Sequence, residues 1–147
     1  MTSNEFQSSW HSFLDHIASL YGTGKREREI SEIIGVVTVR WEGVVTEINL
    51  SEEFSPGIAI TMEPGCVTLN NGESLRSDYQ YLKIDPKNNS AWQQCEIGGH
   101  VRFKARITRP SGPFTSIRLS KAKEGKEVLL MIALYDCEFI CRSLDLI

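Results

Sequence analysis

The chain has 147 residues, a formal net charge of −3 and 24% charged side chains, values that are typical of a single globular domain. The N-terminal residues carry no basic stretch followed by an apolar run, so no signal peptide is expected. The longest apolar run, Val128 to Tyr135, is far shorter than a membrane span. We therefore expect a cytoplasmic protein that does not associate with membranes.

The sequence contains no motif that indicates catalysis or metal binding. The four cysteines are widely scattered and include no C-x-x-C pair: Cys66, Cys95, Cys137 and Cys141. Neither H-E-x-x-H nor G-x-S-x-G occurs, and no pair of carboxylates stands out in an apolar context. We expect free thiols, no disulfide, no metal, no cofactor and no enzymatic activity.

The first predicted element is an amphipathic helix from Glu5 to Tyr21. Thr2 and Glu5 have the spacing of a capping box. The apolar residues that recur at helical spacing on one face are Phe6, Trp10, Phe13, Leu14, Ile17 and Leu20. We expect this face to pack on the rest of the protein; the alternative is an exposed helix that binds a partner. A second short helix is predicted over Lys25–Ile34, with Gly35 ending it.

The stretch from Val36 to Leu50 predicts one long, bent β-strand around which the rest of the chain is organised. Apolar and polar residues alternate with period 2 from Val37 to Val45, as in a half-buried strand. Gly43 interrupts this pattern, and a glycine inside a strand usually marks a bulge or a sharp bend. A strand bent in this way can pair with different neighbours on its two sides, which closes small barrels.

Further strands are predicted by alternation between turn residues. They span Gly57–Met62, Cys66–Leu69, Tyr79–Ile84 and a strand after Gly98-Gly99, with one helical turn over Ala91–Ile97. In the strand after Gly98-Gly99 the residues expected to point inward are Val101, Phe103, Ala105 and Ile107.

The end of the chain predicts a long excursion and one last strand. The excursion runs from Arg109 to Lys126 and includes a possible edge hairpin over Phe114–Leu119. The last strand spans Val128–Ile140 and is apolar on both faces through Leu134, which is expected of a strand covered on both sides.

Three stretches resemble the tRNA-anticodon-binding-like group of bacterial OB-fold domains. They are Val39-x-Trp41-x-Gly43-x-Val45-x-x-Ile48, Gly98-x-x-Val101-x-Phe103-x-Ala105-x-Ile107 and Leu134-x-Asp136-Cys137. The resemblance covers about residues 36–141 and implies a mainly β fold with a small OB-like β-barrel, and it leaves the N-terminal helices unexplained. We therefore expect a helical extension over residues 1–35 followed by an OB-like barrel domain over residues 36–147. The resemblance also implies a ligand on the face of the second and third strands, rimmed by the loops after the first and fourth.

One functional hypothesis is a binding module for single-stranded nucleic acid. Residues 100–126 carry eight lysines and arginines and one acidic residue, whereas both flanking regions are acidic. Arg102, Lys104 and Arg106 form a basic row on one strand face. The excursion adds Arg109, Phe114, Arg118, Lys121 and Lys123, so the surface can follow phosphates while an aromatic ring stacks on a base. The alternative is a solvated strand face whose cations pair with the surplus acids.

The second hypothesis is a protein-binding module, such as an adaptor, an inhibitor or an immunity protein that neutralises a bacterial toxin. A small acidic chain without catalytic motifs fits this class. The acidic residues clustered around the first strand and its loop are Glu42, Glu47, Glu52 and Glu53, and they could meet a basic partner.

Overall fold

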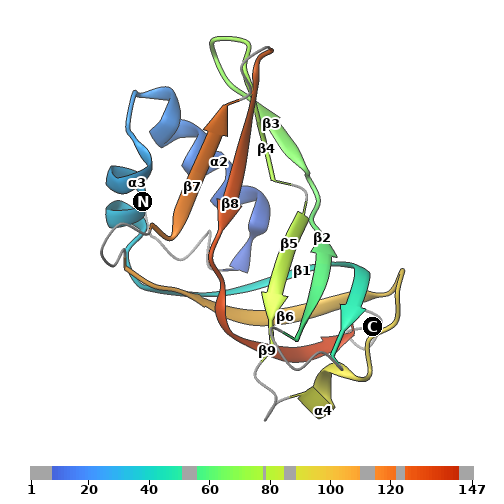
Figure 1. The fold of residues 1–147 in the computed structure, drawn as a ribbon. Helices are drawn as coiled ribbons and strands as arrows, with labels where there is room; N and C mark the ends of the chain where they lie inside the picture. The colour runs from blue at the N-terminus through green and yellow to red at the C-terminus, as the bar shows by residue number, and fades with distance from the viewer. Residues whose placement is uncertain are drawn as a thin grey trace.

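The computed structural model describes residues 8–50, 56–77, 79–84, 89–109, 115–121 and 125–142. Within them the protein is mainly β, with two sheets and few helices (Figure 1). The predicted mainly β class is therefore confirmed, while the closure of an OB-like barrel stays a prediction.

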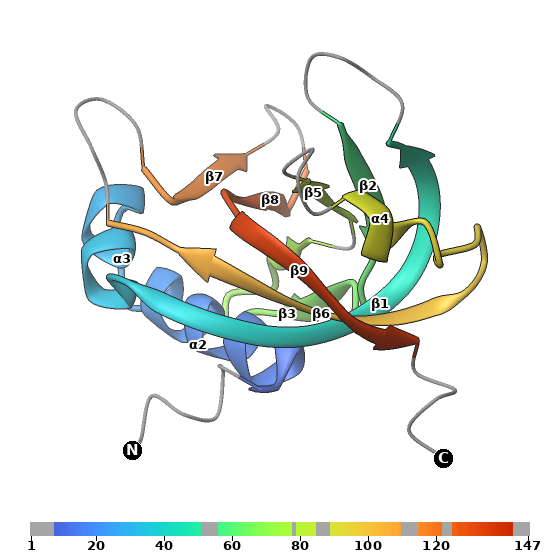
Figure 2. The same ribbon diagram turned by 90° about the horizontal axis from the view of Figure 1, so that it is seen from below.

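The first sheet has five antiparallel strands in the order β5 (Tyr79–Lys83), β2 (Gly57–Thr61), β1 (Val37–Asn49), β6 (His100–Ile107) and β9 (Tyr135–Arg142). Strands β1, β2 and β5 pair in chain order, although β3 and β4 of the other sheet intervene between β2 and β5, and β6 returns beside β1. This order is that of a Greek key. Figure 2 shows β1, β6 and β9 as long strands that curve across one side of the molecule.

The predicted bent strand is confirmed as β1, which changes partners in its middle. It pairs with β6 from Val37 to Val44 and with β2 from Val44 to Asn49. The irregularity in its pairing with β2 lies between Val45 and Glu47, so of the bulge or bend predicted at Gly43 the bulge lies further along the strand. The change of partner falls at Val44, directly after this glycine. Gly43 itself lies where β2 approaches closely, since a Cβ there would overlap the Ile60 side chain.

The second sheet has the order β3 (Cys66–Thr68), β4 (Ser74–Arg76), β8 (Glu127–Ile132) and β7 (Ile117–Lys121). Strands β4 and β8 are parallel, and the other pairs are antiparallel. The predicted final strand over Val128–Ile140 is in fact divided, because β8 belongs to this sheet and β9 to the first. Strand β4 has no counterpart among the predicted elements.

Two N-terminal helices pack on the sheets, and a short one, α4 (Asn89–Trp92), precedes β6. Helix α2 (Trp10–Gly22) begins after Ser9, whose side chain accepts a hydrogen bond from the Ser12 N–H. It therefore starts later than predicted; Thr2, Glu5 and Phe6 lie outside the described residues. Helix α3 (Glu27–Ile34) ends at Gly35, as expected.

The apolar face of α2 lies in the core, so the prediction of a docked helix is confirmed. Trp10, Phe13, Leu14 and Ile17 are all buried. The ring centroid of Trp41 on β1 lies 5.1 Å from that of Trp10 and 4.9 Å from that of Phe13. The Trp10 indole N–H also donates to the Pro64 carbonyl at 2.8 Å. The helices and the strands thus share one hydrophobic core.

Helix α3 covers the outer edge of β7 with two polar side chains. The Ser31 hydroxyl oxygen accepts from the Ile117 N–H at 3.1 Å, and the Glu27 carboxylate accepts from the Leu119 N–H at 2.6 Å. These contacts satisfy N–H groups of an edge strand. If left unpaired, such groups can form hydrogen bonds with a strand of another chain.

Replacing Ser31 with alanine is expected to lower the free energy of unfolding by about 1–3 kcal/mol, because it leaves the buried Ile117 N–H without its acceptor. Urea denaturation followed by circular dichroism measures this change. Thr23→Ala is the control, since its hydroxyl makes an exposed hydrogen bond to Leu20 and its removal should cost far less. Equal losses for the two variants would contradict the role of Ser31.

Candidate functional site

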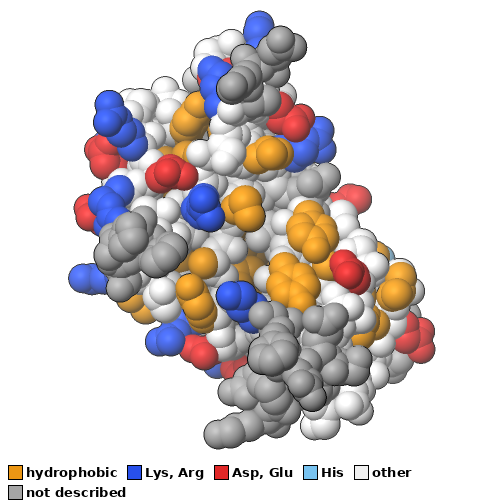
Figure 3. Space-filling model, in the orientation of Figure 1, with side chains coloured by type: hydrophobic (Ala, Val, Ile, Leu, Met, Phe, Trp, Pro, Cys, Tyr) orange, Lys and Arg blue, Asp and Glu red, His pale blue; other side chains and the backbone are white. Residues whose placement is uncertain are grey.

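A group of apolar side chains faces solvent on strands β5, β8 and β9. We name it the tyrosine face, and it consists of Tyr79, Tyr81, Leu129, Met131 and Tyr135. Figure 3 shows hydrophobic side chains gathered over β5 and β8, with lysines and arginines among them. Exposed apolar side chains that gather on one side of a small protein often mark an interaction site.

Exposure within the tyrosine face overturns one prediction. Leu129 and Met131 on β8 have exposed fractions of 46% and 58%, so the doubly apolar run before Leu134 is not covered on both sides. Tyr79 is 54% and Tyr135 is 43% exposed, and the rings therefore present large areas to a ligand. The inward residues of β8, Val128 and Leu130, are buried as the alternation requires.

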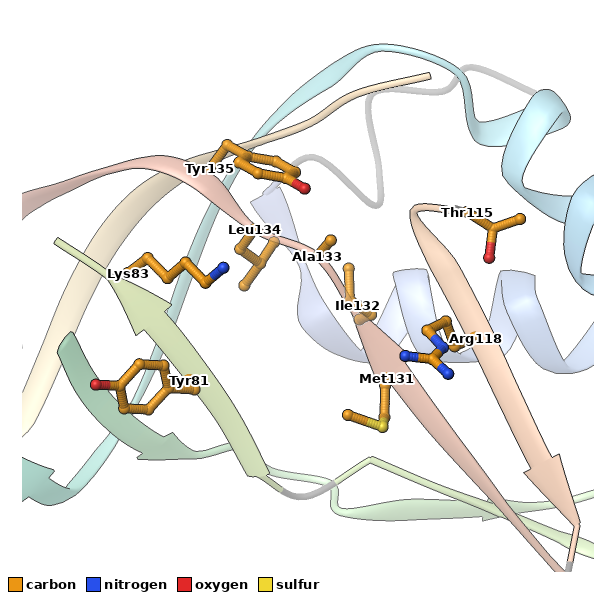
Figure 4. Close-up of a pocket in the computed structure, with 9 residues that line it drawn as sticks. All are labelled: Tyr81, Lys83, Thr115, Arg118, Met131, Ile132, Ala133, Leu134 and Tyr135. Carbon is orange, nitrogen blue, oxygen red and sulfur yellow. The ribbon is translucent and has the colours of Figure 1, made fainter. Parts of the chain in front are cut away.

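A pocket of about 290 Å³ lies within this face, between β5 and the bend that joins β8 to β9 (Figure 4). Its walls are formed by Tyr81 and Lys83 from β5, Thr115 and Arg118 from the region of β7, and the segment from Met131 to Tyr135. Thr115 lies within the predicted excursion and is the first residue described after Arg109. The pocket therefore combines aromatic and aliphatic walls with a hydroxyl and two cations.

The two cations of the pocket differ from most of the basic side chains around them. Within the described residues, neither Lys83 nor Arg118 forms an ion pair. By contrast, the Arg76 guanidinium contacts Glu127 at 3.0 Å. The Lys121 ammonium contacts Glu73 at 2.7 Å, and this hydrogen bond lowers the pKa of the Glu73 carboxyl. Of the basic residues predicted in the excursion, Arg118 thus reaches the pocket, and Lys121 is held by an acid.

The predicted basic row lies elsewhere, on the outer face of β6. The alternation is confirmed, because Val101, Phe103, Ala105 and Ile107 are all buried. However, Lys104 pairs with Glu138 at 3.3 Å and Arg106 with Asp136 at 2.8 Å, both acids being on β9. Arg102 lies opposite Glu42 of β1. This geometry supports the alternative of a solvated face with paired charges.

The remaining predicted site residues do not gather in one place. Arg109 is exposed just beyond the end of β6. Phe114, Lys123, Glu52 and Glu53 lie outside the described residues. Glu42 belongs to the part of β1 that pairs with β6, whereas Glu47 lies in the part that pairs with β2 and accepts a hydrogen bond from Asn49. The two described acids of the predicted protein-binding cluster therefore lie on opposite sides of the point where β1 changes its partner strand.

The described residues contain no group of three His, Cys, Asp or Glu side chains placed to hold a metal ion. The four cysteines are free thiols, with Cys95 and Cys137 buried. Burial raises the pKa of the Cys137 thiol to about 12, with a further contribution from Asp136, so this sulfur is a poor nucleophile. Among the helices described, none is both long and apolar enough to span a membrane.

Comparison with known proteins gives no relative for this chain. No protein-family model, no curated protein and no solved structure matches it.

Proposed function

We propose that this chain is a non-enzymatic, OB-like binding module whose tyrosine face binds single-stranded nucleic acid. The observation that carries the proposal is the combination of three accessible tyrosine rings with two cations that have no acidic partner within the described residues. Exposed rings provide stacking surfaces for unpaired bases, and the cations lie where they can meet phosphates.

The strand order supports the OB-like part of this proposal. In chain order, β1, β2, β5 and β6 have the Greek-key arrangement of a five-stranded OB-fold barrel. Strands β5 and β9 are the third and fifth strands of the sheet, and they approach each other where a barrel would close. The backbone of Lys83 on β5 lies beside the Cys137 thiol of β9 and acts to lower its pKa. The tyrosine face then includes the third strand, where OB-folds often bind oligonucleotides.

The binding test compares tyrosine variants in a fluorescence anisotropy titration with a labelled single-stranded oligonucleotide at low salt. Tyr79→Ala is expected to weaken binding about 5- to 150-fold, since the loss of one stacked base corresponds to about 1–3 kcal/mol. Tyr79 is exposed, so the variant should fold normally. Removing both Lys83 and Arg118 should also make the salt dependence shallower by about 1.4 in log–log slope.

The matched control is the double variant Lys104→Ala/Arg106→Ala, which removes two cations that are already paired with acids. It should bind nearly as tightly as the unmodified protein. If this control loses affinity while Tyr79→Ala retains it, the β6 row is the binding surface and the tyrosine face is not.

A protein partner is the second candidate for the same face. Leu129 and Met131 are aliphatic and exposed at its centre, and methionine and tyrosine are enriched in protein interfaces. An adaptor or an immunity protein would use such a surface. Absence of any oligonucleotide binding at low salt, together with a stable complex that is lost in Met131→Glu, would favour this candidate.

A further inference from the structure

The pocket lies at an opening between β5 and β9, the two edge strands of the five-stranded sheet. We name this opening the β5–β9 seam. Sheet order leaves β5 and β9 as edges, without a ladder between them. The strands that come directly before them in the chain, β4 and β8, do pair with each other. They form a parallel ladder that ends at Arg76 and Leu129. The strands therefore separate just after a paired stretch.

Buried side chains hold the seam at the point where this ladder ends. The Ser77 hydroxyl donates to the Leu130 carbonyl at 2.8 Å. These two residues directly follow Arg76 and Leu129, the last pair of the ladder. The Gln80 amide in turn donates to the Ser77 hydroxyl oxygen at 2.7 Å. Ser77, Gln80 and Leu130 are all buried. The seam is thus built into the fold by specific hydrogen bonds.

The size and walls of the pocket suit one flat ring. Its volume of about 290 Å³ is at the lower end of the range for small-molecule sites, which is about 300–1,000 Å³. Tyr135 and Met131 line the pocket from β9 and β8, whereas the Tyr81 ring extends from β5 over Gly57 of β2 (Figure 4). Aromatic rings and a thioether are favourable neighbours for the face or edge of a nucleobase.

The polar groups of the pocket supply both kinds of hydrogen-bonding partner. The Thr115 hydroxyl donates its hydrogen to the Ile117 carbonyl at 2.7 Å, so its lone pairs remain as acceptors. Arg118 and Lys83 can only donate. A ligand with an amino group beside a ring nitrogen or carbonyl acceptor would match this arrangement, and cytosine and adenine have that pattern.

We propose that the β5–β9 seam accepts one unstacked base of the bound strand and favours cytosine or adenine over thymine. This inference rests on the proposed function, and it adds base selectivity at one position to an otherwise sequence-tolerant surface. Stacking on the tyrosine face supplies affinity, while the Thr115 hydroxyl oxygen accepts from the amino group of the inserted base.

The methionines provide a direct probe of the pocket. In protein labelled with ¹³C at the methionine methyl groups, Met131 reports on the pocket and Met62 on the core, where it is 1% exposed. Addition of a nine-nucleotide oligo(dC) is expected to shift the Met131 signal strongly, because a base ring lies against it, and to leave the Met62 signal in place. Oligo(dT) of the same length should shift it less.

Selectivity is tested by Thr115→Val, with Thr115→Ser as the matched control that retains the hydroxyl. The unmodified protein should prefer oligo(dC) to oligo(dT) roughly 3- to 10-fold, the factor that one neutral hydrogen bond supplies. The valine variant should lose this preference, and the serine variant should retain it.

The outcomes separate this inference from the proposed function. If both oligonucleotides bind through Tyr79 but the Met131 signal does not move, the seam is not a base pocket and the nucleic-acid function stands. A preference that persists in Thr115→Val overturns the role of this hydroxyl. If neither oligonucleotide binds at low salt, the function and the inference both fail.

Discussion

Replacing Trp41 with alanine is expected to lower the free energy of unfolding by about 3–5 kcal/mol. Trp41 is 2% exposed and lies on the long strand β1. Its ring contacts Trp10 and Phe13 of α2, so its removal leaves a cavity between the helix and the sheet. Urea denaturation monitored by circular dichroism gives the change, and the unfolding should remain a single transition.

The control for this experiment is Tyr79→Ala, which removes an exposed ring of the tyrosine face. Its effect on unfolding should be within about 0.5 kcal/mol, as for most surface substitutions. A Trp41→Ala loss of similar size would mean that α2 does not share the core of the sheets. The same control also establishes that a binding defect of Tyr79→Ala does not arise from misfolding.

Periodicity was sufficient to predict which side of an isolated element is buried. The stripe Trp10, Phe13 and Ile17 and the alternation from Val101 to Ile107 both lie in the core as expected. These patterns work because helical and extended backbones place side chains with fixed periods of 3.6 and 2. The partner of the stripe, Trp41, could not be predicted from the period.

The final strand shows why the tyrosine face was missed. A continuous apolar run such as Val128–Leu134 is compatible with a strand covered on both faces, and equally with one whose outer face is an interaction surface. Only the surrounding structure distinguishes the two, and here the outer side of β8 at Met131 is open to solvent. The exposed Tyr79 and the half-buried Tyr81 alternate with buried Gln80 and Leu82, which was the one signal in the sequence.

Charge patterns were misleading for a related reason. The spacing of Arg102, Lys104 and Arg106 predicted their common face correctly, but the acids beside them are remote in sequence. Glu138 and Asp136, which pair with Lys104 and Arg106, lie 34 and 30 residues later on β9. Glu42, opposite Arg102, lies earlier in the chain on β1. Strand β4 was missed because its three residues carry little β signal, and its partner strand β8 lies 53 residues later in sequence. Long-range pairing decides both features, and one sequence does not reveal it.

Replacing Gly43 with alanine is expected to destabilise the protein by about 1–3 kcal/mol, the usual cost of forcing extra atoms into a packed site. Gly43 lies where β1 exchanges β6 for β2. An added Cβ would overlap Ile60 Cγ2 and lie 2.8 Å from the Thr61 carbonyl oxygen. Ile60 is buried and the carbonyl belongs to the backbone of β2, so relief requires the strands to move apart. Thermal unfolding should show a lower midpoint.

Gly57→Ala is the matched control for Gly43→Ala. Its added Cβ would lie 2.6 Å from the Tyr81 hydroxyl oxygen and would also meet the ring, but this is the outer end of a half-buried side chain that can turn away. The cost in stability should therefore be smaller, while oligonucleotide affinity should fall because the Tyr81 ring leaves its place in the tyrosine face. Equal destabilisation by the two substitutions would mean that Tyr81 is fixed as firmly as Ile60, and unchanged affinity would exclude its ring from the binding surface.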